Sequence, residues 1–232
     1  MGTKEELEDW CYEVFRTMWA TRAGTKVPDD ESKLGLKNEA ITLEGTVLYA
    51  DMAESTKLVD SNASFFAAEV YKTFLYCAAR IIKDQDGAIT AYDGDRIMAV
   101  FIGDSKNTNA VKAALKINSA VRDVVQLQLK RVYKDTDYAV SHTTGVDTSE
   151  LFVAKTGVRG ANDLVWVGRA ANHAAKLSSL PSGYTYITKD VYDVMNKSVK
   201  FDSGGSDVWE RRVWSGFNNS TIYRSHGLWT LD

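Results

Sequence analysis

The chain has 232 residues, of which 44% are hydrophobic and 25% are charged, proportions typical of one soluble globular domain. Its net charge of −3 argues against a protein that coats nucleic acid, because such proteins carry a basic surface. No stretch approaches the roughly 18 apolar residues that cross a bilayer, and the N-terminus lacks the apolar core of a secretory signal. We therefore expect a cytoplasmic protein without nucleic-acid or membrane partners.

The N-terminal part separates into a helix and a polar stretch. Apolar residues within residues 4–20 recur at helical spacing: Leu7, Trp10, Cys11, Val14, Phe15 and Met18. This predicts an amphipathic helix whose apolar side must be buried against something. Residues 21–38 are polar and contain one of the two prolines, which predicts a linker or loose connection rather than a packed element. We therefore expect an N-terminal helix and linker over residues 1–40, followed by a catalytic domain over residues 41–232.

The body of the chain alternates strand and helix patterns. The elements expected first are a strand at 46–52, a helix at 64–83, a hairpin within 89–101, a helix at 107–125 and a strand at 138–146. This order is the split βαβ, ferredoxin-like arrangement of the α+β class, with the helices on one sheet face. The elements expected after it are a segment at 151–155, a helix at 168–180, a strand at 184–188, a short helix near Val191 and a closing hairpin from 208–214 and 221–231.

Two aspartates are expected to meet at one edge of this sheet. Asp51 ends the first strand, and Asp95 lies at the tip of the hairpin that Asp93 and Gly94 predict. In a split βαβ sheet this strand and hairpin are neighbours, so the two carboxylates can face each other. Nearby carboxylates repel unless they are protonated or metal-bound, and their oxygens suit Mg²⁺ or Mn²⁺. Two ions roughly 3.5–4 Å apart would let one activate an attacking hydroxyl while the other clamps phosphates.

The segment after Asp51 is a candidate phosphate cradle. Its backbone N–H groups lead toward the next helix and can hold phosphate oxygens. The cradle comprises Ala53, Glu54, Ser55 and Thr56. Spacing alone leaves a plainer alternative open, in which Asp51 caps a turn and Asp93 and Asp95 are ordinary hairpin residues. The sequence has no GxxxxGK[ST] motif, which argues against a P-loop enzyme.

Three segments resemble motifs of the class III nucleotidyl cyclases. Residues 45–56, GTVLYADMAEST, resemble the first metal-binding segment of that family, and residues 91–101, AYDGDRIMAVF, resemble the second. Residues 167–180, VGRAANHAAKLSSL, are similar to the transition-state helix, with Gly168, Asn172 and Lys176 at the motif positions. The three motifs occur in the order of the family, over the chain from about residue 44 to its C-terminus.

The resemblance implies a βαββαβ core and a head-to-tail homodimer whose active sites are shared between the subunits. It implies two Mn²⁺ or Mg²⁺ ions in each site, held by Asp51 and Asp95 with the Met52 carbonyl as a further ligand. Asn172 would orient the ribose, and Lys176 would stabilise charge on the phosphates as they are displaced. The dimer would place this helix opposite the aspartates of the partner.

The chain also departs from the family pattern. Lys176 stands where the family usually has Arg, so the bidentate guanidinium fork is missing. The adenine-reading residues of the adenylate cyclases are absent as well, since Ala91 and Val165 occupy those positions. A shifted alignment would bring Asp163 into one of them. We therefore expect a base other than adenine.

Tyr49 and Arg96 are the candidate base-reading residues. Tyr49 would limit the room for the base, and Arg96 would donate a hydrogen bond to a pyrimidine carbonyl. Two alternatives stay open, because an aromatic residue at the position of Tyr49 is common in the family and Arg96 can instead pair with Asp93. Arg169 is a candidate contact to the triphosphate. His173 shares no metal-type spacing with the other two histidines and is expected to face away from the site.

These substitutions in a compact cyclase are similar to those of the pyrimidine cyclases of bacterial anti-phage defence (Pycsar systems). The resemblance implies conversion of UTP to 3′,5′-cyclic UMP and pyrophosphate, with the product activating a separate effector as a second messenger. Uracil offers two carbonyl acceptors, which favours UTP over CTP opposite a donor such as Arg96. The alternatives are, in order, a cytidylate cyclase, an adenylate or guanylate cyclase, and a non-catalytic nucleotide-binding module.

Overall fold

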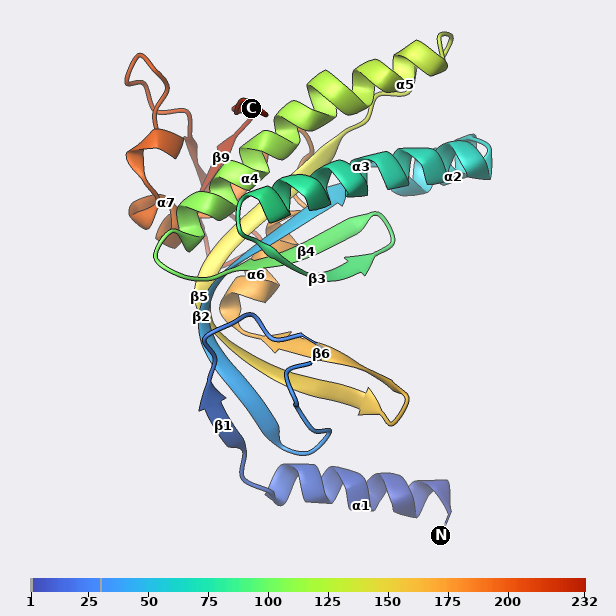
Figure 1. Cartoon of the computed structure of the whole chain (residues 1–232), viewed down its shortest axis with the longest axis vertical. Helices are drawn as coiled ribbons and strands as arrows, with labels where there is room; N and C mark the ends of the chain where they lie inside the picture. The colour runs from blue at the N-terminus through green and yellow to red at the C-terminus, as the bar shows by residue number, and fades with distance from the viewer. Residues whose placement is uncertain (1, 30) are drawn as a thin grey trace.

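The computed structural model describes residues 2–29 and 31–232, which form an α+β fold around one mixed sheet (Figure 1). The sheet has nine strands in the order β3-β4-β2-β5-β7-β9-β8, with β1 paired to β2 and β6 paired to β5. The strands are β1 (Ala20–Ala23), β2 (Glu39–Met52), β3 (Ala88–Asp93), β4 (Arg96–Phe101), β5 (His142–Val158), β6 (Ala161–Val167), β7 (Thr185–Thr188), β8 (Glu210–Trp214) and β9 (Ser220–Ser225). The helices are α1 (Thr3–Arg16), α2 (Ser55–Ser61), α3 (Ser64–Asp84), α4 (Lys106–Ala120), the π-helical turn η1 (Val121–Val125), α5 (Gln126–Val132), α6 (Arg169–Leu177), α7 (Lys189–Val194) and the 3-10 turn η2 (Lys197–Val199).

The split βαβ arrangement is confirmed. Strand β2 runs through the middle of the sheet and pairs antiparallel with both β4 and β5. The helices α3 and α4 that connect these strands lie together on one face of the sheet (Figure 1). Helix α6 packs on the opposite face. Within the described residues, no helix combines the length and hydropathy needed to cross a bilayer.

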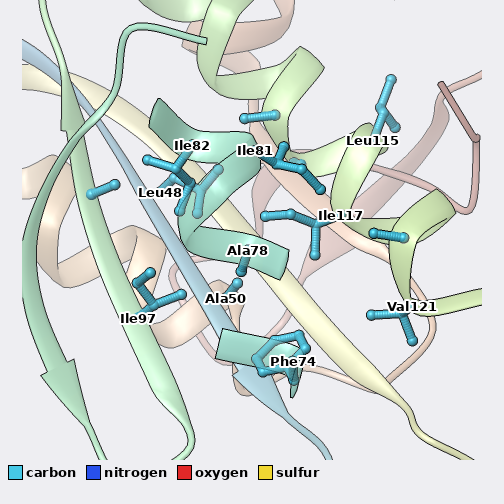
Figure 2. Packing of buried hydrophobic residues seen from close by; sticks show 14 of the residues in the cluster. Leu48, Ala50, Phe74, Ala78, Ile81, Ile82, Ile97, Leu115, Ile117 and Val121 are labelled. Atoms are coloured by element: carbon cyan, nitrogen blue, oxygen red, sulfur yellow. The ribbon is translucent and has the colours of Figure 1, made fainter. Parts of the chain in front are cut away.

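The larger core lies between the sheet and the α3–α4 layer. Alternation along β2 points Leu48 and Ala50 toward this layer, where they meet the apolar side of α3 (Figure 2). Phe74 and Ile82 of α3 are completely buried there. Each fully buried side chain of this size contributes roughly 1.5–3 kcal/mol, so this core holds the central strands against the two helices. The residues that Figure 2 labels around it are Leu48, Ala50, Phe74, Ala78, Ile81, Ile82, Ile97, Leu115, Ile117 and Val121.

Helix α6 approaches the other face of the sheet unusually closely. Its small residues Ala170, Ala171 and Ala174 pack in the cluster formed by that face. Gly145 of β5 makes the approach possible, since a Cβ atom there would lie 2.2 Å from the Ala174 carbonyl oxygen. A side chain at this position would push α6 away from the sheet.

Helix α1 forms as expected, but its apolar side is not buried. It contains no buried residue, and the apolar residues beside it are open, with Phe15 88% and Met18 90% exposed. The Asn38 amide donates hydrogen bonds to the carbonyls of Val14 (2.8 Å) and Thr17 (2.7 Å), which fixes only the C-terminal end of the helix. The single chain therefore leaves the apolar stripe uncovered, and its burial against another surface stays a prediction.

Several elements differ from those that the sequence patterns predicted. The expected linker begins with β1, which pairs parallel with β2, so the prediction of a loose connection over residues 21–38 is wrong at its start. Strand β2 begins seven residues earlier than expected, at Glu39 rather than Thr46, and the segment at 151–155 is part of the long strand β5. The second helix of the core continues through η1 into α5 instead of ending near Val125.

Candidate active site

The end of β2 and the β3–β4 turn bring the predicted metal ligands together. Asp51 pairs directly with Arg96 in the β2–β4 register, and Asp95 is the residue before Arg96. The turn itself consists of Gly94 and Asp95, one residue later than expected, with Gly94 in the left-handed region at a φ of 61°. Tyr49, two residues before Asp51, lies on the same face of β2. The predicted juxtaposition of the two aspartates is therefore present in the strand register.

Electrostatics mark Asp51 as the central group of this site. Its side chain is 20% exposed, and its Oδ2 atom lies 3.8 Å from Nε of Arg96. A second nitrogen of the same guanidinium lies 3.8 Å from Oδ2 of Asp93. The pKa of Asp51 is raised to about 6. Burial is the largest cause, the charges of Asp95 and Asp93 act in the same direction, and Arg96 opposes them. A site that disfavours a lone carboxylate in this way favours a bound cation.

The residues present fit a divalent metal ion. Among the described residues, Oδ2 of Asp95 and Nε of Arg96 are buried polar atoms without a hydrogen-bond partner. The Met52 side chain is buried in the core behind the strand, so only its backbone carbonyl is suited to the site. No group of three or more His, Cys, Asp or Glu side chains within the described ranges is arranged to hold a metal. The two carboxylates suit Mg²⁺, which usually takes its other ligands from water and substrate phosphates.

The predicted phosphate cradle is only partly free. The Ala53 N–H donates to the Ser141 carbonyl (2.9 Å), so the prediction that this group holds phosphate is wrong for the conformation observed. Glu54 adopts the left-handed region with a φ of 56°, which is uncommon for a residue with a side chain. Helix α2 begins directly after it, and the N–H groups of Ser55 and Thr56 belong to its first turn, where intrahelical partners are lacking.

The structure adds Tyr138, a residue that the sequence patterns missed. Its hydroxyl oxygen is buried and has no hydrogen-bond partner within the described chain. Burial, together with the nearby Tyr71, Glu54 and Asp95, raises the pKa of Tyr138 to about 12. A neutral hydroxyl donor therefore lies near Asp95, one of the predicted metal ligands. Its position at the start of an expected strand gave no sign of this role, because the approach depends on how the segment before β5 crosses the site.

The other half of the motif set lies on α6. Ala170, Ala174 and Leu177 turn toward the sheet and are buried, whereas Asn172 and Lys176 lie on the opposite side of the helix and are exposed. The two polar residues are one turn apart and share that side. They therefore point away from the sheet that carries the aspartates of their own chain.

Proteins similar to this chain identify the family. No protein-family model matches it. A "Uridylate cyclase" of Xanthomonas perforans is 56% identical over the whole of both chains, and one of Burkholderia cepacia is 46% identical, also over the whole of both. A third, from Rhodovulum sp., is 40% identical and spans 97% of this chain and 96% of its own. The chain belongs to the uridylate cyclase family.

Solved structures agree on the fold of this cyclase. The guanylyl cyclase Cya2 superposes with a TM-score of 0.68 at 17% identity, over 82% of this chain and 95% of its own. The adenylyl cyclase CyaB from P. aeruginosa superposes with a TM-score of 0.66 at 20% identity, over 80% and 95%. The chain is therefore a nucleotidyl cyclase with the class III fold, as its motifs predicted.

Two further predicted residues of the cyclase have different surroundings. Tyr49 is half-buried beside the metal-binding edge, where burial raises its pKa and the nearby Arg96 lowers it. Arg169 instead uses its guanidinium within its own chain, where it contacts Asp147 and Asp190 and donates to the Thr148 carbonyl (2.8 Å). Its predicted contact with the triphosphate would require it to leave these partners.

Proposed function

We propose that the cyclase is a homodimer that converts UTP to 3′,5′-cyclic UMP and pyrophosphate. The observation that carries the proposal is the meeting of Asp51 and Asp95 at one sheet edge, with Arg96 opposite Asp51 and Tyr49 on the same face. The full-length relatives named uridylate cyclase support the choice of substrate.

The chemistry divides between two sets of side chains. Asp51, Asp95 and the Met52 carbonyl would hold two Mg²⁺ or Mn²⁺ ions, which supply Lewis acidity that lowers the pKa of the ribose 3′-hydroxyl and neutralise phosphate charge. Asn172 would orient the ribose so that the 3′-oxygen attacks the α-phosphate in line. Lys176 would stabilise the negative charge that moves onto the departing pyrophosphate.

The proposed dimer follows from the direction of these side chains. Asn172 and Lys176 are exposed on the side of α6 that faces away from their own sheet. A second copy, placed head to tail, would bring its Asp51 and Asp95 to this surface. Each active site would then take its metal ligands from one subunit and its ribose and phosphate contacts from the other.

Arg96 and Tyr49 are the proposed determinants of the base. Arg96 lies 3.8 Å from both Asp51 and Asp93, so it is held at the site by two weak ion pairs. Metal binding would neutralise Asp51 and free one side of the guanidinium to donate to a uracil carbonyl. The half-buried Tyr49 beside it would limit the room for the base.

A substrate panel tests the proposal. The purified cyclase is incubated with Mn²⁺ and each of the four ribonucleoside triphosphates, and the products are identified by chromatography and mass spectrometry. Cyclic UMP is the expected main product. Cyclic CMP in its place would refute the assignment of UTP, and cyclic AMP or cyclic GMP would refute the assignment of a pyrimidine. Asp51→Asn should abolish product formation, whereas Asp104→Asn, at an exposed surface position, should not.

We also propose that cyclic UMP is a second messenger in anti-phage defence, made in the cytoplasm and read by a separate effector. The similarity to the pyrimidine cyclases of Pycsar systems supports this role. Phage should form fewer plaques on bacteria that express the cyclase together with its effector than on bacteria that express the effector alone. Equal plaque numbers with the wild-type cyclase and with Asp51→Asn would contradict it.

A further inference from the structure

A buried carboxylate lies directly beneath the helix that carries Asn172 and Lys176. Asp147 of β5 is 0% exposed and pairs with Val47 in the β2–β5 register, on the sheet face that α6 covers. Its Oδ1 atom accepts a hydrogen bond from the Thr188 hydroxyl (2.5 Å). A fully buried charge is costly unless other groups compensate it, so the second carboxylate oxygen, Oδ2, also needs polar partners.

Two side chains of α6 contact Oδ2 of Asp147. Nδ1 of His173 lies 3.0 Å from Oδ2 of Asp147, and Nε of Arg169 lies 3.4 Å from the same oxygen. Both contacts are within ion-pair distance but lack the alignment of a hydrogen bond. Burial raises the pKa of Asp147, while hydrogen bonds from the Thr188 hydroxyl and the Thr148 backbone N–H, together with the two α6 residues, act in the opposite direction. Asp147 therefore joins β5 to the first two turns of α6 through one oxygen.

The neighbours of His173 extend this contact toward Lys176. The imidazole packs edge-on against Phe217 of the β8–β9 turn, with ring centroids 4.4 Å apart, and against Trp214 at 5.6 Å. Phe217 also contacts Lys176, whose Nζ lies 5.1 Å from the ring centroid. A continuous set of contacts thus runs from the buried Asp147 through His173 and Phe217 to the ammonium group.

We propose that Asp147 and His173 are positioning residues, which fix α6 on the sheet so that Asn172 and Lys176 meet the substrate in the correct orientation. The proposal rests on the proposed function of those two residues. Neither Asp147 nor His173 touches the substrate in it. The small residues of α6 make the polar contact necessary, because Ala170, Ala171 and Ala174 alone allow the helix to slide or rotate. An error of about 1 Å in such a position can cost on the order of 100-fold in rate.

A single substitution at Asp147 tests the positioning role through its separate effects on kcat and KM. Asp147→Asn keeps the shape of the side chain and removes its charge. We expect kcat for cyclic UMP formation to fall on the order of tenfold to 100-fold, with KM for UTP within about twofold, because positioning acts on the transition state. Asp123→Asn is the matched control, since that carboxylate pairs only with Arg122 at the surface. Wild-type kcat in Asp147→Asn would overturn the proposal.

A double variant separates positioning from stability. Asp147→Val combined with His173→Leu removes the buried charge together with its imidazole partner and leaves only the neutral Thr188 hydroxyl without its acceptor, so the thermal unfolding midpoint should lie closer to that of the wild type than the midpoint of Asp147→Asn does. We expect kcat to stay low, because apolar packing does not set the rotation of α6. Recovery of wild-type kcat together with stability would overturn the proposal, since packing alone would then suffice. This variant also keeps the test valid if Asp147→Asn folds poorly.

Mixed dimers show whether the defect is confined to α6. Two differently tagged chains, Asp51→Ala and Asp147→Asn, are co-expressed, and the heterodimer is isolated through both tags. One of its sites then combines an intact aspartate pair with an intact α6, so activity should recover to about half that of the wild type. A dimer that stays inactive would show that the Asp147→Asn defect reaches the metal half of the same chain, against the proposal.

A parallel heterodimer tests the proposed function separately. Lys176→Ala combined with Asp51→Ala should also recover activity, because these residues belong to different halves of a shared site. If this heterodimer stays inactive while the wild type is active, the proposal of a site shared between subunits is wrong. If it succeeds and the Asp147→Asn pair fails, only the positioning role is wrong.

Discussion

His142, the first residue of β5, should make the stability of the cyclase depend on pH. The side chain is 5% exposed, and its Nε2 atom has no hydrogen-bond partner among the described residues. Its ring lies 5.5 Å from that of Phe74, in the core beneath α3. Burial lowers the pKa of His142 from 6.5 to about 4. The folded protein therefore holds this imidazole in its neutral form throughout the physiological range.

The sign and size of the pH effect on stability follow from the difference between the pKa of His142 in the unfolded and in the folded chain. Between pH 6.5 and about 4 the unfolded chain binds a proton at His142 that the folded chain does not, so the free energy of unfolding falls as the pH falls. At 1.36 kcal/mol for each pKa unit, the shift corresponds to about 3 kcal/mol. This contribution is fully present above pH 6.5 and is lost progressively toward pH 4.

Urea unfolding of the wild type and of His142→Leu measures the pH-dependent contribution of His142 to the free energy of unfolding. Tryptophan fluorescence follows unfolding at pH values from 4.5 to 8, at one fixed protein concentration because dimerisation also contributes. The two proteins should differ little at pH 8, and the wild type should lose stability relative to the variant as the pH falls. Other groups that titrate in this range, such as Asp51, are present in both proteins and cancel. His226→Leu, at an exposed position, is the matched control. Parallel stability curves for the wild type and His142→Leu would refute the reasoning.

Three further changes test the fold and the site. Gly145→Ala should destabilise the protein by about 1–3 kcal/mol in urea unfolding and lower cyclase activity, because the new Cβ meets the backbone of α6; Gly216→Ala, where nothing is closer than 4.0 Å, should do neither. Deletion of residues 2–16 should change the free energy of unfolding by only about 0.5 kcal/mol, since α1 buries no residue; a loss of several kcal/mol would show that its apolar side is covered in solution. Lys176→Ala should lower kcat on the order of 100-fold, whereas Lys176→Arg should retain more activity, because it keeps the charge and the contact with Phe217; equal loss in both would argue against a role for the charge.

The parts of the fold that bury one regular face were predictable from the sequence. Helix α3 was placed to within a residue, because its apolar positions recur at helical spacing and Asp86, in the left-handed region, ends it with Gly87. Strand β6 was missed for the opposite reason. It lies along β5 with most of its residues exposed. Only Leu164 and Trp166 are partly buried, and the exposed residues beside them, Val165 and Val167, are apolar as well, so the sequence shows no alternation of polar and apolar residues. Strand β1 is exposed throughout and was read as part of a linker.

The candidate site divides in the same way. Asp51 and Asp95 could be brought together from the sequence because a strand and a tight hairpin fix their register. The contacts of Asp147 could not, since Asp147 lies just past the end of the strand expected at 138–146 and nothing in the sequence there indicates that a helix will bury it. Tyr138 was missed because its segment approaches the metal ligands only through the tertiary path of the chain before β5.

The contacts of Asp147 also explain why one chain of the proposed enzyme would be insufficient. Through Asp147 and Gly145, strand β5 holds α6 tightly against the sheet, so the helix cannot turn its exposed side toward the Asp51 of its own chain. The rigidity that would position Asn172 and Lys176 for a partner would therefore also prevent them from completing a site with the aspartates of their own chain. In the proposed dimer, activity would depend on subunit association, and any factor that shifts that equilibrium would control the amount of cyclic nucleotide made.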